Sequence, residues 1–413
     1  MGIHPPFRAE HIGSLLRPAG LLALRQKFNR GEVDQQELAA AENRAIEEAV
    51  ALQGRLGFKL ATDGEFRRRS YHSYFYAQLG DVAPDAVMSD AGDGSGGRVS
   101  QPAAVIRSKL RWTHPIHVDD FKLLKSLTRA VPKITIPGPC ALHFRGGDKA
   151  VTAHAYRDVD EFWSDTIKAY HDELAALSAA GCTYVQIDET AFAKFGDPAV
   201  QATLAARGDD WRLLIDRYID VTNRVLRGAD GIRIGMHLCR GNRGGHWHAE
   251  GSYDLVADKL FNALDIDFFF LEYDSPRAGD FSPLRLVPKG KTIALGLVST
   301  KAATVEDKAA LKRRIEEAGR HVDLDRLALS PQCGFASSEE GNPIPPEGAG
   351  GETSAGGRRR TGGLGRKLTI GQTRRSALTL RVEEASLTRI AAATPTARLD
   401  CQHGFGFAGG GGV

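Results

Sequence analysis

Short apolar runs alternate along the chain with longer segments whose apolar residues recur at helical spacing. Helical periodicity covers five segments, Leu38–Leu56, Asp160–Ala179, Trp211–Leu226, Tyr253–Leu264 and Val305–Ala318. Eight runs have the length of buried strands: Arg8–Ile12, Phe58–Thr62, Lys133–Ile136, Thr183–Ile187, Ile232–Met236, Phe268–Leu271, Thr292–Leu295 and Arg326–Leu329. Strands that alternate with helices favour a parallel sheet. Eight of them predict an α/β fold, a closed (β/α)8 TIM barrel.

In such a barrel the working face is the rim at the carboxyl ends of the strands. Polar or reactive residues follow the predicted strands at Gly13-Ser14, Asp63-Gly64-Glu65, Asp188-Glu189, His237-Leu238-Cys239, Glu272 and Pro331-Gln332-Cys333. Ordinary turn chemistry accounts for glycine, proline and single acids at these places. It accounts poorly for a His-x-Cys pair and a lone cysteine, which therefore indicate a site.

The composition changes near residue 341. We expect residues 1–343 to form the barrel and residues 344–413 to form a low-complexity, disordered tail, because glycine and proline disfavour a helix over 345–365. A reading-frame change near residue 344 is one hypothesis for this tail, and a natural low-complexity segment is the other. Within the barrel, Pro84–Gly97 reads as a mobile inserted loop. The aromatic cluster Tyr71–Tyr76 before it suits either a pocket wall or the packing of an inserted hairpin.

Composition narrows the class of protein. Apolar residues make up 42% and charged residues 25%, which is typical of globular proteins. The formal charge of +3 gives no reason to expect nucleic acid or a membrane as partner. Five scattered cysteines argue against a disulfide framework, and the first residues lack a signal-peptide pattern, so we expect a cytoplasmic protein.

Four rim residues form a candidate metal site: His237, Cys239, Glu272 and Cys333. Alternate residues of an extended chain point the same way, so His237 and Cys239 can reach one ion. Zn²⁺ favours sulfur and nitrogen ligands in a tetrahedral shell, which these four side chains would fill. The alternative for each is structural: a buried histidine or cysteine, and for Glu272 an ion pair with Arg277 or Arg240. The other cysteines, Cys140, Cys182 and Cys401, are left outside the site, and His246 and His248 are expected at the surface.

The ligand set suggests a reaction. Two thiolates neutralise much of the charge of zinc, so the ion suits binding of a substrate thiol as thiolate better than activation of water. Alkyl transfer to sulfur is the expected chemistry. Glu65 and Asp188 are the expected catalytic and substrate-binding acids, able to hold an ammonium, and Ser14 would hold a carboxylate. The alternative for the acids is pairing with the Arg67–Arg69 run.

These residues resemble the catalytic barrel of cobalamin-independent methionine synthase. The matching stretches are Ile12–Ser14, Asp63–Phe66, Gln186–Glu189, His237-x-Cys239, Glu272 and Cys333-Gly334, in the family's order. The resemblance implies zinc at His237, Cys239, Glu272 and Cys333, and homocysteine held by Ser14, Glu65 and Asp188. The chain is most similar to the short, single-barrel members.

Two departures from the family pattern bear on the methyl donor. The second, N-terminal barrel of full-length synthases has no counterpart, and Val298-Ser299 stand where the resemblance implies a proton-donating histidine. The donor therefore stays open, with methyl-tetrahydrofolate as one candidate. Two other functions remain: zinc-dependent alkylation of another thiol, such as epoxide opening by a thiol cofactor, and a metal-binding barrel whose catalysis has lapsed.

Overall fold

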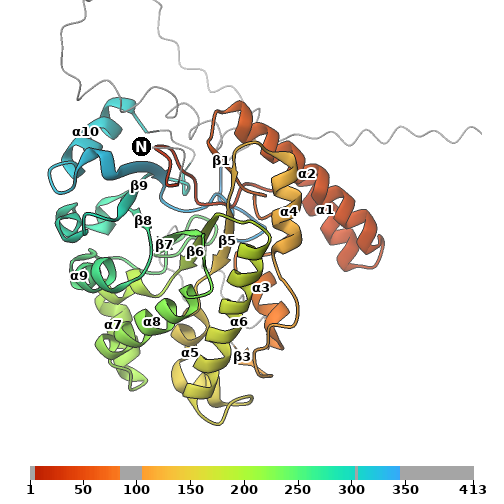
Figure 1. Ribbon diagram of the computed structural model, residues 1–413, viewed down its shortest axis with the longest axis horizontal. Helices are drawn as coiled ribbons and strands as arrows, with labels where there is room; N and C mark the ends of the chain where they lie inside the picture. Colours follow the sequence, from red (N-terminus) through yellow and green to blue (C-terminus); the bar gives the residue numbers. More distant parts are fainter. Residues whose placement is uncertain (1–4, 84–104, 303–305, 345–413) are drawn as a thin grey trace, which may run out of the picture.

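The computed structural model describes residues 5–83, 105–302 and 306–344 (Figure 1). The predicted loop Pro84–Gly97 and the predicted tail from residue 345 onward lie outside these residues. The boundary expected near residue 343 stays a prediction.

Eight strand positions form a parallel barrel, as predicted. The six-stranded sheet has the order β10-β9-β8-β7-β6-β5 and consists of β5 (Ile134–Pro137), β6 (Tyr184–Glu189), β7 (Arg233–Leu238), β8 (Phe268–Glu272), β9 (Thr292–Val298) and β10 (Leu327–Pro331). The short strand β1 (Leu60–Ala61) pairs with β4 (Val131–Pro132), which leads into β5. A parallel bridge from Ala9 to Leu329 places the first predicted strand beside the last.

The first predicted strand, Arg8–Ile12, forms only this bridge. The backbone carbonyls of His11 and Ile12 accept hydrogen bonds from the side chains of Lys133 and Gln186, not from a neighbouring strand. Side-chain donors thus replace the ladder that the apolar pattern predicts. The chain then turns at Gly13, whose φ is 142°, and brings Ser14 to the rim.

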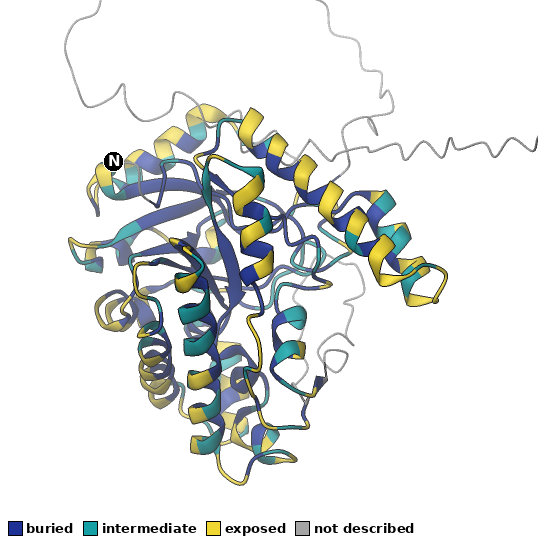
Figure 2. Cartoon of the chain, turned by 45° about the vertical axis from the view of Figure 1, so that its right-hand side comes forward, coloured by how far each residue is buried: buried dark blue, intermediate teal, exposed yellow. Residues whose placement is uncertain are grey.

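Ten α-helices are found in the described residues, and they surround the sheet with their exposed faces outward (Figure 2). They are α1 (Ala19–Asn29), α2 (Gln35–Arg55), α3 (Ser73–Leu79), α4 (Val118–Leu127), α5 (Ala141–Thr152), α6 (Val159–Ala179), α7 (Pro198–Ala206), α8 (Trp211–Leu226), α9 (Asp254–Ala263) and α10 (Lys308–Ala318). The five predicted helices correspond to α2, α6, α8, α9 and α10, although the predicted start of the last at Val305 is outside the described residues.

The described residues also form smaller elements. Short 3₁₀ segments occur at Phe192–Gly196, Pro276–Ala278, Ser282–Leu286 and Leu324–Arg326. An antiparallel pair, β2 (Val82–Ala83) and β3 (Val105–Ile106), flanks the predicted insertion. Among the described helices, none combines the length and apolarity that a bilayer crossing requires.

Candidate metal centre and its pocket

The four predicted metal ligands meet at the carboxyl ends of three strands. His237 lies in β7 and Cys239 one residue after it, Glu272 is the last residue of β8, and Cys333 follows β10. One ligand atom from each lies within 4.8 Å of the others, and all four side chains are buried. Strands β7 and β8 extend further than the sequence predicts, so that they include His237 and Glu272. The sheet itself therefore fixes the positions of these two residues.

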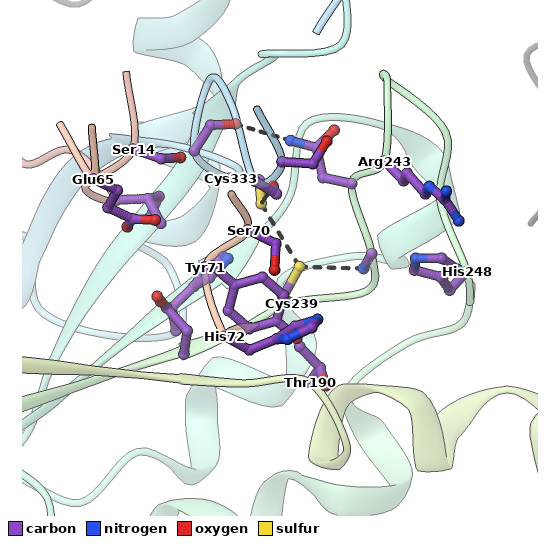
Figure 3. Close-up of a pocket in the computed structure, with 18 of the residues that line it drawn as sticks. Ser14, Glu65, Ser70, Tyr71, His72, Thr190, Cys239, Arg243, His248 and Cys333 are labelled. Atoms are coloured by element: carbon purple, nitrogen blue, oxygen red, sulfur yellow. Dashed lines mark hydrogen bonds between the residues drawn. The ribbon is translucent and has the colours of Figure 1, made fainter. Parts of the chain in front are cut away.

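The two sulfurs have the spacing of a metal site. Sγ of Cys239 and Sγ of Cys333 are 3.6 Å apart (Figure 3). A disulfide would bring them to about 2.05 Å, whereas two Zn–S bonds of 2.3 Å at a tetrahedral angle separate sulfurs by about 3.8 Å. The hydrogen bond between the two groups lowers the pKa of the Cys333 thiol and raises the pKa of the Cys239 thiol. The pair therefore readily gives one thiolate, which the second thiol stabilises by its hydrogen bond.

The nitrogen and oxygen ligands are left without hydrogen bonds. Both ring nitrogens of His237 and both carboxylate oxygens of Glu272 are buried and unpartnered among the described residues. Buried polar atoms normally have partners, so these four atoms fit a bound cation. Burial raises the pKa of the Glu272 carboxyl, and the Lys301 charge opposes that rise.

The structural alternative for Glu272 is only partly realised. Arg240 donates to the backbone carbonyl of Glu272 at 3.2 Å, and the nearest Arg277 nitrogen is 4.0 Å from its carboxylate. Neither guanidinium makes a hydrogen bond with the carboxylate, which remains available to a metal ion.

The predicted substrate residues line the same pocket. Ser14, Glu65 and Asp188 border a cavity of about 780 Å³, its open mouth included, together with His237, Cys239 and Cys333. In Figure 3, Ser14 and Glu65 lie on one side of the sulfurs, and Arg243 and His248 lie on the other. We refer to the pocket region of Ser14, Glu65 and Asp188 as the acidic end.

Glu65 is held by an unusual backbone. Its φ of 60° places a non-glycine residue in the left-handed region, which is uncommon and concentrates at functional sites. Its Oε1 accepts a hydrogen bond from Thr135 at 2.9 Å, whereas Oε2 is buried without one. The expected alternative partner, Arg68, approaches Oε2 only to 3.9 Å. One carboxylate oxygen of this pocket-lining residue therefore has no hydrogen bond among the described residues.

Asp188 carries a perturbed carboxyl group. Gln186 donates to its Oδ1 at 2.6 Å. Burial, followed by repulsion from Glu65, raises the pKa of Asp188 to about 7, although His237 opposes the shift. An ammonium bound beside the two acids would favour their charged forms.

Arg17, which sequence reasoning missed, joins three rim loops. Its guanidinium is buried and donates to the carbonyls of Glu65, Arg68, Ala336 and Ser338 at 2.7–3.2 Å. The segments that carry Ser14, Glu65 and Cys333 are thus tied to one side chain. An arginine three residues after a turn gives no sign of this in the sequence.

The expectation that His248 lies at the surface is wrong. It lines the pocket. The chain turns back at Gly241, whose φ is 101°, and brings His248 close to this glycine. A Cβ at position 241 would lie 2.0 Å from the His248 ring, so only glycine fits there. Tyr71 and His72 of the aromatic cluster also line the pocket, so this cluster forms part of a wall. Cys140 and Cys182 are buried away from the metal ligands, as expected.

Gly334 offers a test of the acidic end. A Cβ at Gly334 would lie 1.9 Å from Oγ of Ser14 and 3.2 Å from its Cβ. We expect Gly334→Ala to displace the Ser14 hydroxyl and to weaken binding of an amino-acid ligand by about tenfold, as for loss of one charge-assisted hydrogen bond. Titration calorimetry measures the affinity and metal analysis the zinc content. Gly290→Ala, where a Cβ meets nothing within 4 Å, is the control. Unchanged affinity in Gly334→Ala would contradict the role of Ser14.

Comparison with known proteins identifies a family that this chain matches. Residues 7–344 match the family model "Cobalamin-independent synthase, Catalytic domain". The uncharacterized protein YxjH of Bacillus subtilis (strain 168) is 39% identical over 345 residues, covering 83% of this chain and 90% of the relative. The methionine synthase of Pyrococcus abyssi is 24% identical over 328 residues, covering 78% and 85%.

A solved structure shows the same fold. It is described as the putative vitamin-B12 independent methionine synthase from Listeria monocytogenes and is 34% identical, with a TM-score of 0.64, covering 81% of this chain and 93% of the other. The family match spans the strands that carry Ser14, Glu65, Asp188 and all four candidate ligands. The chain is therefore a short member of the cobalamin-independent methionine synthase family.

Proposed function

We propose that this protein is a zinc-dependent methyltransferase that binds the thiol of homocysteine and methylates it to the thioether of methionine. One observation carries the proposal: four ligand atoms lie within 4.8 Å of one another, and three of their residues, His237, Cys239 and Cys333, line the pocket that also holds Ser14, Glu65 and Asp188. A metal site and an amino-acid site thus share one cavity.

His237, Cys239, Glu272 and Cys333 would hold the zinc ion. Zinc in such a sulfur-rich site binds a substrate thiol as thiolate near neutral pH, where a free thiol of pKa about 8.5 is mostly protonated. The buried, unpartnered atoms of His237 and Glu272 support a resident cation. The 3.6 Å between the sulfurs supports zinc in preference to a disulfide.

The acidic end would orient the amino acid. The free Oε2 of Glu65 and the carboxylate of Asp188 would bind the ammonium group, and the Ser14 hydroxyl would donate to the carboxylate. Fixing both groups directs the side-chain sulfur toward Cys239 and Cys333. Orientation of this kind is a main source of rate enhancement in a two-substrate reaction.

In the transfer step a bond forms between the thiolate sulfur and the methyl carbon while the bond from that carbon to the donor atom breaks. The electron pair of the broken bond stays on the donor atom, which takes up a proton. Ser299 cannot supply an imidazole for this proton, and its hydroxyl accepts a hydrogen bond from the Lys301 backbone at 3.2 Å. The methyl donor is therefore left unnamed. Alkylation of a different thiol is the second candidate function, and it is supported by the same cluster of metal ligands beside the pocket.

The test follows the metal and the thiol separately. The purified full chain is expected to hold about one zinc ion, and X-ray absorption should show an additional zinc–sulfur bond after homocysteine is added. 2-Mercaptoethanol, which lacks the amino-acid groups, is the control ligand. A zinc shell that homocysteine leaves unchanged would contradict homocysteine as the nucleophile, and a metal-free protein that stays folded and active would contradict zinc dependence.

A further inference from the structure

Arg145 is a buried cationic residue that the proposed function does not use. It lies on α5, the helix that follows β5 at the rim, and it lines the pocket with an exposed fraction of only 9%. Its Nη2 contacts the Tyr71 hydroxyl at 3.4 Å, a weak interaction for a guanidinium. Its Nε and Nη1 are buried with no hydrogen-bond partner among the described residues. A buried cation is therefore incompletely satisfied at the wall of the pocket.

Three other buried arginines of the barrel differ, whereas Arg68, which also has two nitrogens without a hydrogen bond, lies 3.9 Å from the Glu65 carboxylate. Arg17 donates to four backbone carbonyls, and Arg25 pairs with Glu42 at 2.8 Å. Arg240 donates to two carbonyls and lies over the ring of Tyr253. For Arg145, by contrast, no ion pair within 4.0 Å is found in the described part of the chain. Burial of an unpaired charge is unfavourable, so a structural role does not explain this side chain.

Basic groups lie near Arg145, together with the buried carboxyl of Glu189, which acts electrostatically on the same Tyr71 and Lys194. Arg145 acts electrostatically on Lys194 and His72, and it lowers the pKa of each, although burial is the larger cause for both. Another cationic side chain, Arg243, lines the same pocket. We refer to the part of the pocket lined by Arg145 and Arg243 as its basic side, whereas Glu65 and Asp188 belong to the acidic end. Figure 3 shows Tyr71, the contact of Arg145, beside Cys239.

We propose that Arg145 binds an oxyanion group, a carboxylate, phosphonate or sulfonate, of the methyl donor. The inference rests on the proposed function, which assigns the acidic end to the ammonium of the thiol substrate and the sulfurs to the metal. The basic side of the pocket then belongs to the second reactant. The planar fork of a guanidinium suits two parallel hydrogen bonds to such a group. A cationic donor, such as a sulfonium, would meet repulsion there.

The test uses methylphosphonate as a small oxyanion probe on the zinc-loaded full chain. Thermal unfolding is measured with the probe and with chloride at equal ionic strength, for the parent protein, Arg145→Gln, Arg145→Lys and the control Arg217→Gln, an arginine on α8 outside the pocket. The probe is expected to raise the unfolding midpoint of the parent and of Arg217→Gln, and Arg145→Gln should weaken its affinity by about tenfold or more. Arg145→Lys, which keeps the charge but not the fork, should retain part of the shift.

A second readout separates binding from structure. In chloride, Arg145→Gln should unfold at the same temperature as the parent or higher, since it removes an unpaired buried charge. A lower midpoint in chloride together with an undiminished probe shift would show a structural arginine and overturn the proposal. If Arg145→Gln fails to fold, two other results would overturn the proposal. One is a parent protein whose unfolding midpoint the probe does not raise, and the other is a full probe shift in Arg145→Lys.

Homocysteine binding distinguishes this proposal from the proposed function. Its affinity should be unchanged in Arg145→Gln. A tenfold loss of homocysteine affinity would assign Arg145 to the carboxylate of the amino acid and overturn the donor site, while the thiol methyltransferase proposal would stand. Absence of homocysteine binding by the parent, with the probe shift intact, would instead contradict the proposed function.

Discussion

Cys333→Ser is expected to lower the affinity for zinc by about 100- to 1,000-fold and to abolish methyl transfer. Structural zinc sites release about 10–16 kcal/mol on binding, so one of four ligands contributes on the order of 3–4 kcal/mol. Cys333 supplies one of two sulfurs that lie 3.6 Å apart. A serine hydroxyl remains protonated near neutral pH and replaces a thiolate poorly.

Competition with a fluorescent chelator measures the zinc affinity of this variant. Cys182→Ser is the matched control, since Cys182 is also a buried free thiol but does not line the pocket. Zinc affinity should be unaffected in the control. Equal zinc affinity in Cys333→Ser and the parent would remove Cys333 from the ligand set and leave the pocket without its proposed metal.

Asp188→Asn is expected to weaken homocysteine binding by about 10- to 100-fold without changing the zinc content. A hydrogen bond to a charged group contributes about 1.5–3 kcal/mol, and the asparagine cannot offset the charge of an ammonium. The remaining acid, Glu65, keeps part of the affinity because its Oε2 has no other hydrogen bond.

Calorimetric titration of the zinc-loaded variant with homocysteine tests this expectation. Asp172→Asn removes an acid of α6 that pairs with Lys168 outside the pocket, and it serves as control. The same titration with 2-mercaptoethanol should give equal affinities for Asp188→Asn and the parent, because that thiol has no ammonium. An effect of similar size on both thiols would show that Asp188 acts through the metal site, not through the amino group.

The barrel and its metal ligands could be predicted because each depends on a local pattern. Apolar runs mark β5 to β10, and the residues at their ends must meet once the sheet closes. His237, Cys239, Glu272 and Cys333 therefore converge although up to 96 residues separate them, from 237 to 333. The extent of the first strand could not be predicted in this way, since the carbonyls of His11 and Ile12 are satisfied by the side chains of Lys133 and Gln186.

The basic side of the pocket could not be found from the sequence. Arginine on a helix is most often a solvated surface residue, whereas Arg145 is buried and contacts Tyr71, which comes from a distant segment. His248 reaches the pocket through the turn at Gly241, whose φ of 101° no apolar periodicity reveals. Residues whose roles depend on contacts between loops are thus the ones that pattern reasoning misses.

The pairing of Ala9 with Leu329, and the contacts of Arg17 with Ala336 and Ser338, have a consequence for synthesis of the protein. The ribosome must reach residue 329 before Ala9 gains its partner, and residue 333 before the last proposed metal ligand, Cys333, becomes available. Until then a nascent chain carries His237, Cys239 and Glu272 without a complete shell. Zinc uptake should therefore be a late event, coupled to closure of the barrel, and a chain that stops before Cys333 should bind zinc only weakly.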